Sequence, residues 1–217
     1  MDISVESIID AEPHLVIGYE TETVSREALT KAGIPLYVLP AYCDDLDQPS
    51  FQAVLDEVRL FGELFDAEAA ANAAIADLQS QIDRATQSPV VPDGTTGAAL
   101  FVAGDESAVY AYTAQQLVDV QMSELGVRNV FAGLKDFVPE ISAESLIEQN
   151  PDILILLYTD TTRSPDDVAG IVRRLPGADA LTAVKNNALY PLLLNFSQPA
   201  SPLTVQGLQR LRDLLST

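Results

Sequence analysis

Apolar runs and amphipathic stretches alternate along most of the chain, which is the pattern of an α/β fold. Strands of a parallel sheet that is covered on both faces are continuously apolar, and the runs with this property are "HLVIGY", "IPLYVLP", "AALFVA", "DILILLY" and "ALYPLLL". The stretches between them, such as "TVSREALTKAG" and "PDDVAGIVRRL", carry apolar residues at helical spacing. We therefore predict alternating helices and strands, with a hairpin through "GDESAVYAY".

One phrase occurs twice, as "ISVESIIDAEPHLVIG" at 3–18 and as "ISAESLIEQNPDILIL" at 141–156. Each copy is typical of a short helix that ends before a proline, Pro13 or Pro151, and is followed by a buried strand. Ser142 is the predicted N-cap of the second helix. Two such units indicate two similarly built lobes, because their separation is far too long for the period of a solenoid.

A long helix is predicted from Asp66 to about Gln87, where the sequence is rich in Ala and Gln and has no Gly or Pro. Its acidic start suits the positive end of a helix dipole, and at about 1.5 Å per residue it would be roughly 33 Å long. It could be a surface helix of one domain or a rigid connection between two lobes. We favour the connection, which gives a partial N-terminal lobe (1–65), a linking helix (66–88) and a C-terminal lobe (89–217).

Composition narrows the class of protein. With 32 acidic and 12 basic residues the net charge is −20, which disfavours nucleic acids and anionic membranes as partners. Apolar residues make up 47% of the chain, too many for a disordered acidic segment. No apolar run approaches the roughly 18 residues of a membrane span. Cys43 is the single cysteine, so no disulfide can form within the chain.

Several segments together resemble the solute-binding proteins of ATP-driven importers for ferric siderophores, haem and cobalamin. Both copies of the repeat carry the likeness, as do "LTKAGIPLYVLP", "LFDAEAAANAAI" and "LTAVKNNALYPL". The resemblance implies two Rossmann-like lobes joined by one long rigid helix, with the ligand in a shallow cleft between them. Members of that family normally begin with a further strand and helix. The first lobe is therefore expected to be truncated, with exposed edges through which two copies could pair.

The resemblance also implies a function. It predicts an extracytoplasmic protein, periplasmic or lipid-anchored after a lipoprotein signal, that captures a ferric siderophore and delivers it to an ABC permease, with no cofactor of its own. A haem- or cobalamin-binding or relay protein of the same fold is the alternative. Glu6 and Glu144 occupy the same place in the two repeat copies, and each would dock onto an arginine of the permease. The simpler explanation of these glutamates is that acidic residues favour helix N-termini.

Candidate ligand contacts follow the predicted strands, because ligands of open α/β sheets bind beyond the carboxyl ends of the strands. The stretches at 19–23, 104–113, 158–165 and 195–202 present Tyr19, Tyr110, Tyr112, Tyr158, Arg163, Asn195 and Phe196. Tyrosines can stack on flat ligands, although each could equally occupy a core position. Arginine can pair with a carboxylate or catecholate oxygen. The net charge of −20 favours a neutral or cationic chelate over a strongly anionic one.

An enzyme is the main rival class, and the sequence argues against it. His14 is the single histidine and begins an apolar strand, where a structural role is expected. There is no Cys/His metal spacing, no G-x-S-x-G and no complete phosphate loop. The acidic run "CDDLD" at 43–47 lacks the glycine and terminal glutamate of an EF-hand. We expect neither catalysis nor a protein-bound metal ion.

Overall fold

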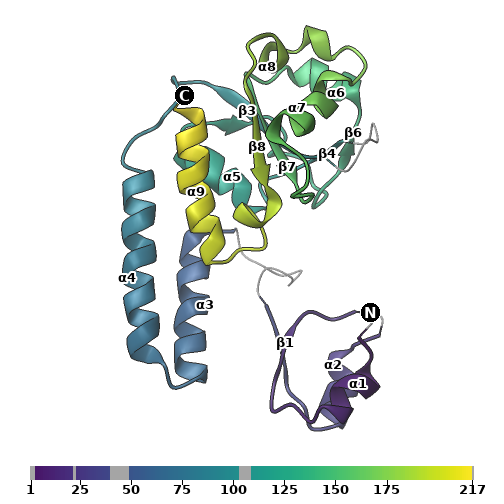
Figure 1. Cartoon of the computed structure of the whole chain (residues 1–217), viewed down its shortest axis with the longest axis vertical. Helices are drawn as coiled ribbons and strands as arrows, with labels where there is room; N and C mark the ends of the chain where they lie inside the picture. Colours follow the sequence, from purple (N-terminus) through teal and green to yellow (C-terminus); the bar gives the residue numbers. More distant parts are fainter. Residues whose placement is uncertain (1–2, 22, 40–48, 103–108, 217) are drawn as a thin grey trace. The chain divides into compact units, whose positions relative to one another are not determined.

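The computed structural model of the chain describes residues 3–21, 23–39, 49–102 and 109–216 (Figure 1). The chain divides into two compact units, residues 1–47 and 48–217, each of which is described by itself. The "CDDLD" run at 43–47 and the first residues of the predicted hairpin, 104–108, lie outside the described residues.

The first unit packs two short helices on one face of a two-stranded sheet. Its elements are α1 (Val5–Asp10), β1 (Val16–Gly18), α2 (Arg26–Lys31) and β2 (Leu36–Val38). The strands run parallel, with Val16 opposite Leu36. Leu29 is fully buried beneath the sheet, whereas Ile17 and Tyr19 are 41% and 53% exposed. The helices therefore cover one face of this small sheet within the unit, and apolar side chains remain exposed outside that face.

The second unit holds most of the chain. In order its elements are α3 (Phe51–Leu64), α4 (Glu68–Ala85), β3 (Thr96–Val102), β4 (Val109–Ala111), α5 (Leu117–Glu124), β5 (Arg128–Asn129), β6 (Glu140–Ile141), α6 (Ala143–Gln149), β7 (Ile153–Tyr158), α7 (Pro165–Arg173), the short 3-10 helix η2 (Ala178–Ala180), α8 (Thr182–Lys185), β8 (Leu189–Leu193), the 3-10 turn η3 (Leu194–Phe196) and α9 (Pro202–Leu215).

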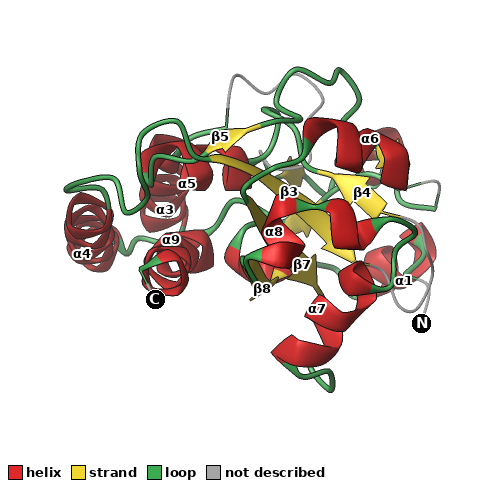
Figure 2. Ribbon diagram, turned by 90° about the horizontal axis from the view of Figure 1, so that it is seen from above, coloured by secondary structure: helices red, strands yellow, loops and turns green. Residues whose placement is uncertain are grey.

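These strands form one mixed sheet in the order β6-β4-β3-β7-β8, with β5 also paired to β3. β3, β7 and β8 are parallel, while β4 pairs antiparallel with both β3 and β6. Figure 2 shows α5 and α9 on one side of the sheet and α6, α7 and α8 on the other. Alternate residues of β7 enter the two cores, so Ile155 packs toward α5 and α9 and Leu156 toward α7. This is why the strand sequence is continuously apolar, and the predicted α/β fold is confirmed.

The predicted long helix is present as α4, one continuous helix of 18 residues. It begins later than Asp66 because that residue has a φ of 51° and separates α4 from α3. Close packing of the two helices depends on Gly62, since a Cβ there would lie 2.4 Å from the Cβ of Ala71. α4 also packs against α9, and both α3 and α4 belong to the second compact unit. The assignment of residues 1–65 to one lobe and of α4 to a connecting role stays a prediction.

The repeated phrase folds the same way in both places. Ser4 and Ser142 are the N-caps of α1 and α6, as predicted for Ser142, and each hydroxyl accepts a hydrogen bond from the N–H three residues on. Glu12 and Asn150, at equivalent positions before the prolines, both have positive φ, 47° and 42°. A left-handed residue thus ends each helix before its strand. No helix of the described chain is both long and apolar enough to cross a membrane.

Candidate ligand-binding face

Tyr158 lies at the carboxyl end of β7, opposite Leu193 at the end of β8. It is the first residue of β7 that is not fully inside the sheet, and its side chain is half-buried. Its side chain lines two neighbouring hollows of the second unit. One hollow opens beyond the carboxyl ends of β3 and β7, where a ligand of an α/β sheet is expected. The other extends along β8 to the last turns of α9.

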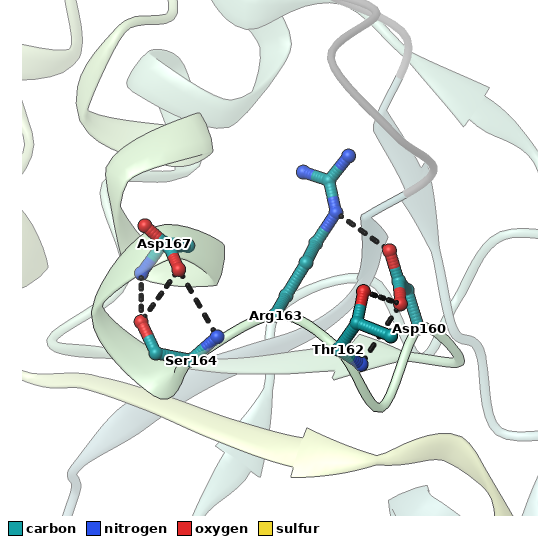
Figure 3. Close-up of polar contacts among 5 residues, drawn as sticks. All are labelled: Asp160, Thr162, Arg163, Ser164 and Asp167. Carbon is teal, nitrogen blue, oxygen red and sulfur yellow. Dashed lines mark hydrogen bonds and ion pairs between the residues drawn. The ribbon is translucent and has the colours of Figure 1, made fainter.

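The smaller hollow, here the β3–β7 hollow, has a volume of about 220 Å³. Its lining comes from the ends of β3 and β7, from the loop after β7 and from α7: Phe101, Val102, Tyr158, Thr159, Asp160, Arg163, Val168 and Ile171. Arg163 is oriented here by Asp160, whose Oδ2 accepts a hydrogen bond from its Nε at 3.2 Å (Figure 3). The Arg163 side chain is 25% exposed and contributes to the lining of the hollow.

Asp160 is itself fixed by Thr162. The Asp160 Oδ1 atom accepts hydrogen bonds from the hydroxyl of Thr162 at 2.6 Å and from its main-chain N–H at 2.9 Å. These bonds, followed by the contact with Arg163, hold the pKa of Asp160 below its usual value. The carboxylate therefore stays charged at neutral pH and keeps Arg163 in place.

The start of α7 is rigid for a similar reason. Ser164 is its N-cap, and Ser164 and Asp167 exchange hydrogen bonds in a capping box, which Figure 3 shows beside Arg163. The Ser164 hydroxyl, 2.7 Å from Asp167 Oδ2, is the main cause of the lowered pKa of Asp167. Pro165 at the first helical position further restricts the backbone. Arg163 thus lies between the hydrogen-bonded turn at Asp160 and Thr162 and the capping box at the start of α7.

The larger hollow, here the β8–α9 hollow, has a volume of about 420 Å³. It is lined by Tyr158, Pro191, Leu192, Leu193, Phe196, Arg210, Asp213 and Leu214. The guanidinium carbon of Arg210 lies 4.2 Å from the ring centroid of Phe196, a cation–π contact. An aromatic ring, a cation and aliphatic side chains together suit a ligand with flat apolar parts and outward-facing oxygen atoms.

The structure brings four predicted residues to the ends of β7 and β8: Tyr158, Arg163, Asn195 and Phe196. Tyr110 is half-buried on β4, opposite Phe101 near the end of β3. Tyr112 is only 3% exposed inside the core, where burial raises its pKa to about 12. Tyr19 belongs to the first unit and is exposed there. The ligand roles of these residues stay predictions.

Most of the lining residues were not predicted from the sequence, and Phe101 and Arg210 are two of them. Phe101 is the last residue but one of β3, and a ligand-facing role could have been considered from its position alone. Arg210 comes from the last helix, and nothing in the local sequence shows that it lies over Phe196. Within the described ranges, no group of three or more His, Cys, Asp or Glu side chains is arranged to hold a metal ion.

The two candidate docking glutamates share one local geometry. Glu6 and Glu144 are exposed in the first turns of α1 and α6. In each case the residue's own main-chain N–H, then the N-cap serine hydroxyl, holds the carboxyl pKa below its usual value. No ion pair involves either glutamate among the residues described. Both therefore present a charged carboxylate to solvent.

Comparison with known families decides the class of protein. A family profile described as periplasmic binding protein matches residues 1–192. The chain belongs to the periplasmic binding protein family. Members of this family are solute-binding proteins of ABC importers that act outside the cytoplasm, and they are not enzymes. No curated protein sequence matches the chain.

Solved structures support this assignment. A protein described as an ABC-type Fe3+-hydroxamate transport system, from Saccharomonospora viridis, is 33% identical, with a TM-score of 0.84 over 100% of this chain and 73% of its own. The periplasmic heme-binding protein HutB of Vibrio cholerae is 18% identical, with a TM-score of 0.80 over 100% of this chain and 82% of its own. The vitamin B12-binding protein BtuF of Vibrio cholerae is 16% identical, with a TM-score of 0.76 over 97% and 77%. The two Vibrio proteins show the shared fold alone.

Proposed function

We propose that this periplasmic binding protein captures a ferric siderophore and delivers it to the permease of an ATP-driven importer. The observation that carries the proposal is the 33% identity, along the whole chain, to a protein described as an Fe3+-hydroxamate transport system. Ferric hydroxamates are compact chelates whose surface carries oxygen atoms and aliphatic arms. Such a ligand differs from a free anion, which a chain of net charge −20 would repel.

The ligand would bind at the carboxyl ends of β7 and β8. Tyr158 lies between the two hollows, so its ring can contact a chelate that occupies either of them. Arg163, oriented by Asp160, would donate hydrogen bonds to chelate oxygens from one side. Phe196 would pack against the aliphatic arms from the other side, with Asn195 and Tyr110 as peripheral contacts.

Delivery would use Glu6 and Glu144. Each carboxylate is exposed, charged and held in a fixed orientation by its own helix N-terminus. Arginine side chains pair with carboxylates in a defined geometry, so one glutamate per unit would give both attraction and register on a permease. The same local structure in both units supports this role, because a partner with two equivalent subunits needs two equivalent contacts.

Haem or cobalamin is the alternative ligand. The aromatic and aliphatic lining of the β8–α9 hollow would also accept the edge of a flat macrocycle. One observation favours the siderophore, the higher identity to the hydroxamate-transport protein.

A thermal-unfolding screen separates these ligands. The purified chain is heated with a ferric trihydroxamate, the same siderophore without iron, haem or cobalamin. We expect the ferric hydroxamate to raise the Tm most, because a ligand at 100 times its Kd stabilises the folded state by about 2.7 kcal/mol. Haem is followed in parallel by its Soret absorbance. Stabilisation by haem or cobalamin but by no iron chelate would overturn the proposal in favour of the alternative.

A further inference from the structure

A buried glutamine donates a hydrogen bond to the main chain of Phe196 in the turn η3. Gln121 on α5 is 0% exposed. Its Nε2 donates hydrogen bonds to the main-chain oxygens of Phe196 and Thr204, both at 2.8 Å. One side-chain amide therefore ties α5 to the turn η3 and to the first turn of α9. These bonds act on the main chain of Phe196, while its ring faces the β8–α9 hollow.

A glycine on α9 completes this support. A Cβ atom at Gly207 would lie 1.7 Å from the main-chain oxygen of Phe196 and 2.9 Å from its Cβ, closer than real side chains come. Only glycine lets the backbone of α9 pack so tightly against η3. The main chain of Phe196 is thus confined between Gly207 and the amide of Gln121.

The chemistry of Gln121 suggests more than core packing. Its Oε1 atom is buried and has no hydrogen-bond partner in the described part of the chain. Burying an unpaired amide oxygen costs free energy, and an apolar side chain of the same length would avoid that cost. Gln121 therefore contributes here through the two hydrogen bonds that its Nε2 atom donates. Sites that break a packing rule in this way are often those where function needs a defined geometry.

We infer that Gln121 and Gly207 are positioning residues for ligand binding. They fix the main chain of Phe196 so that its ring, with Arg210 stacked 4.2 Å from the centroid, forms a rigid wall of the β8–α9 hollow. A preformed wall binds ligand more tightly than a mobile one, because less conformational freedom is lost on binding. The inference rests on the proposed function in that the hollow receives the chelate.

A ligand-free measurement tests the positioning directly. The chain contains no tryptophan, so Phe196→Trp places a single tryptophan fluorophore in the hollow. Gln121→Met or Gly207→Ala is added, and acrylamide quenching and emission wavelength are recorded. Gln116→Met is the matched control, because Gln116 is also buried, at 3% exposed. Its Nε2 donates a hydrogen bond to the main-chain oxygen of Phe137, and its Oε1 accepts one from the N–H of Thr113, so neither bond involves Phe196.

We expect stronger quenching and a red-shifted emission with Gln121→Met and with Gly207→Ala, and neither change with Gln116→Met. With Phe196 intact, Gln121→Met should raise the chelate Kd about tenfold, while Gln116→Met leaves it unchanged. Unaltered fluorescence in Gln121→Met would overturn the inference. So would failure of Gln121→Met to fold where Gln116→Met folds, since Gln121 would then be a stability residue.

The proposed function and the inference fail in different ways. If the unsubstituted chain binds no iron chelate, haem or cobalamin, the proposed function is wrong. The quenching experiment needs no ligand, so it still shows whether Gln121 and Gly207 hold residue 196 in place.

Discussion

Glu6 and Glu144 are each the second residue of a short helix whose N-cap is a serine, Ser4 in α1 and Ser142 in α6. The same two groups, the glutamate's own N–H and the serine hydroxyl, lower the pKa of both carboxyls in the same order of importance. The repeated phrase in the sequence is therefore a repeated structure. It places one charged and exposed carboxylate on each compact unit.

Replacement of these glutamates should affect transport and leave binding intact. Glu144→Ala should change the free energy of unfolding by less than about 0.5 kcal/mol, as exposed substitutions usually do. Ligand affinity should also be unchanged. Transporter-stimulated ATP hydrolysis should fall, and Glu144→Lys should lower it further, because a buried interfacial charge pair commonly costs about 2–5 kcal/mol when broken. The double variant with Glu6→Ala should be worse than either single one.

Glu148→Ala is the control for this prediction. Glu148 is exposed on the same helix, in its last turn rather than its first. It should have no effect on transport if the position of Glu144 matters and not merely the acidity of α6. Normal uptake by the double variant at ordinary expression would leave only the helix-dipole explanation of the two glutamates.

Tyr158 should contribute to ligand affinity through its ring. Tyr158→Ala should raise the chelate Kd about tenfold, because aromatic contacts contribute roughly 0.5–1.5 kcal/mol beyond the area they bury. The matched control is Tyr190→Ala, which removes another half-buried tyrosine of the same sheet that lines neither hollow. Titration calorimetry distinguishes the two. Equal losses of affinity in both variants would point to general loosening of the sheet.

The contact between α3 and α4 should depend on Gly62. Gly62→Ala places a methyl group 2.4 Å from the Cβ of Ala71, and overpacking of this kind costs about 1–3 kcal/mol. This exceeds the gain of about 1 kcal/mol that alanine brings to a helix interior. The control is Gly170→Ala in α7, whose new methyl meets only the flexible end of Arg174 at 3.2 Å. Urea unfolding should show Gly62→Ala destabilised and Gly170→Ala unchanged or stabilised.

The link between β3 and the start of β7 should make stability depend on pH. Asp152 Oδ2 accepts hydrogen bonds from the N–H of Thr96 at 2.8 Å and from its hydroxyl at 2.7 Å. These bonds hold the pKa of Asp152 below its ordinary value of 3.8. A lowered pKa in the folded state means that the charged form stabilises the fold above pH 3.8 and that this contribution is lost as the pH falls through the lower value.

Thr96→Val tests this dependence. At pH 7 it should lower the free energy of unfolding by about 1 kcal/mol, a modest figure because Asp152 is exposed to solvent. The difference from the unsubstituted chain should shrink below pH 3.8, where Asp152 protonates in the unfolded state. Thr95→Val, which removes a hydroxyl bonded to the neutral Pro92 carbonyl, should show no such trend. A constant difference across pH in Thr96→Val would refute the assignment.

The apolar runs predicted the strands of the second unit well because β7, at the centre of the sheet, has both faces buried and is apolar at every position. β1, β2, β7 and β8 lie within the predicted runs, and β3 begins two residues before its run, at Thr96. The two-residue strands β5 and β6 were not predicted, since their pairing with β3 and β4 comes from tertiary contacts rather than local pattern. The start of α4 was misplaced by two residues because the left-handed φ of Asp66 has no sequence signature.

The candidate site was predictable only in part. The rule that ligands bind beyond strand ends singled out Tyr158 and Arg163, which share the β3–β7 hollow. The same rule included Tyr112, although its ring is turned into the core. Arg210 was missed because its contact with Phe196 depends on the close approach of α9 that Gly207 permits. Contacts between helices remote in sequence are not visible in a single sequence.

Titration calorimetry of the chain with a ferric trihydroxamate measures iron-chelate capture itself, with the iron-free siderophore as the reference titrant. We expect a single binding event with a Kd of about micromolar or tighter, equivalent to about 8 kcal/mol or more, and much weaker binding of the iron-free form. Equal affinity for the two forms, or no heat of binding for the ferric form at concentrations near its solubility, would contradict a role in iron-chelate capture.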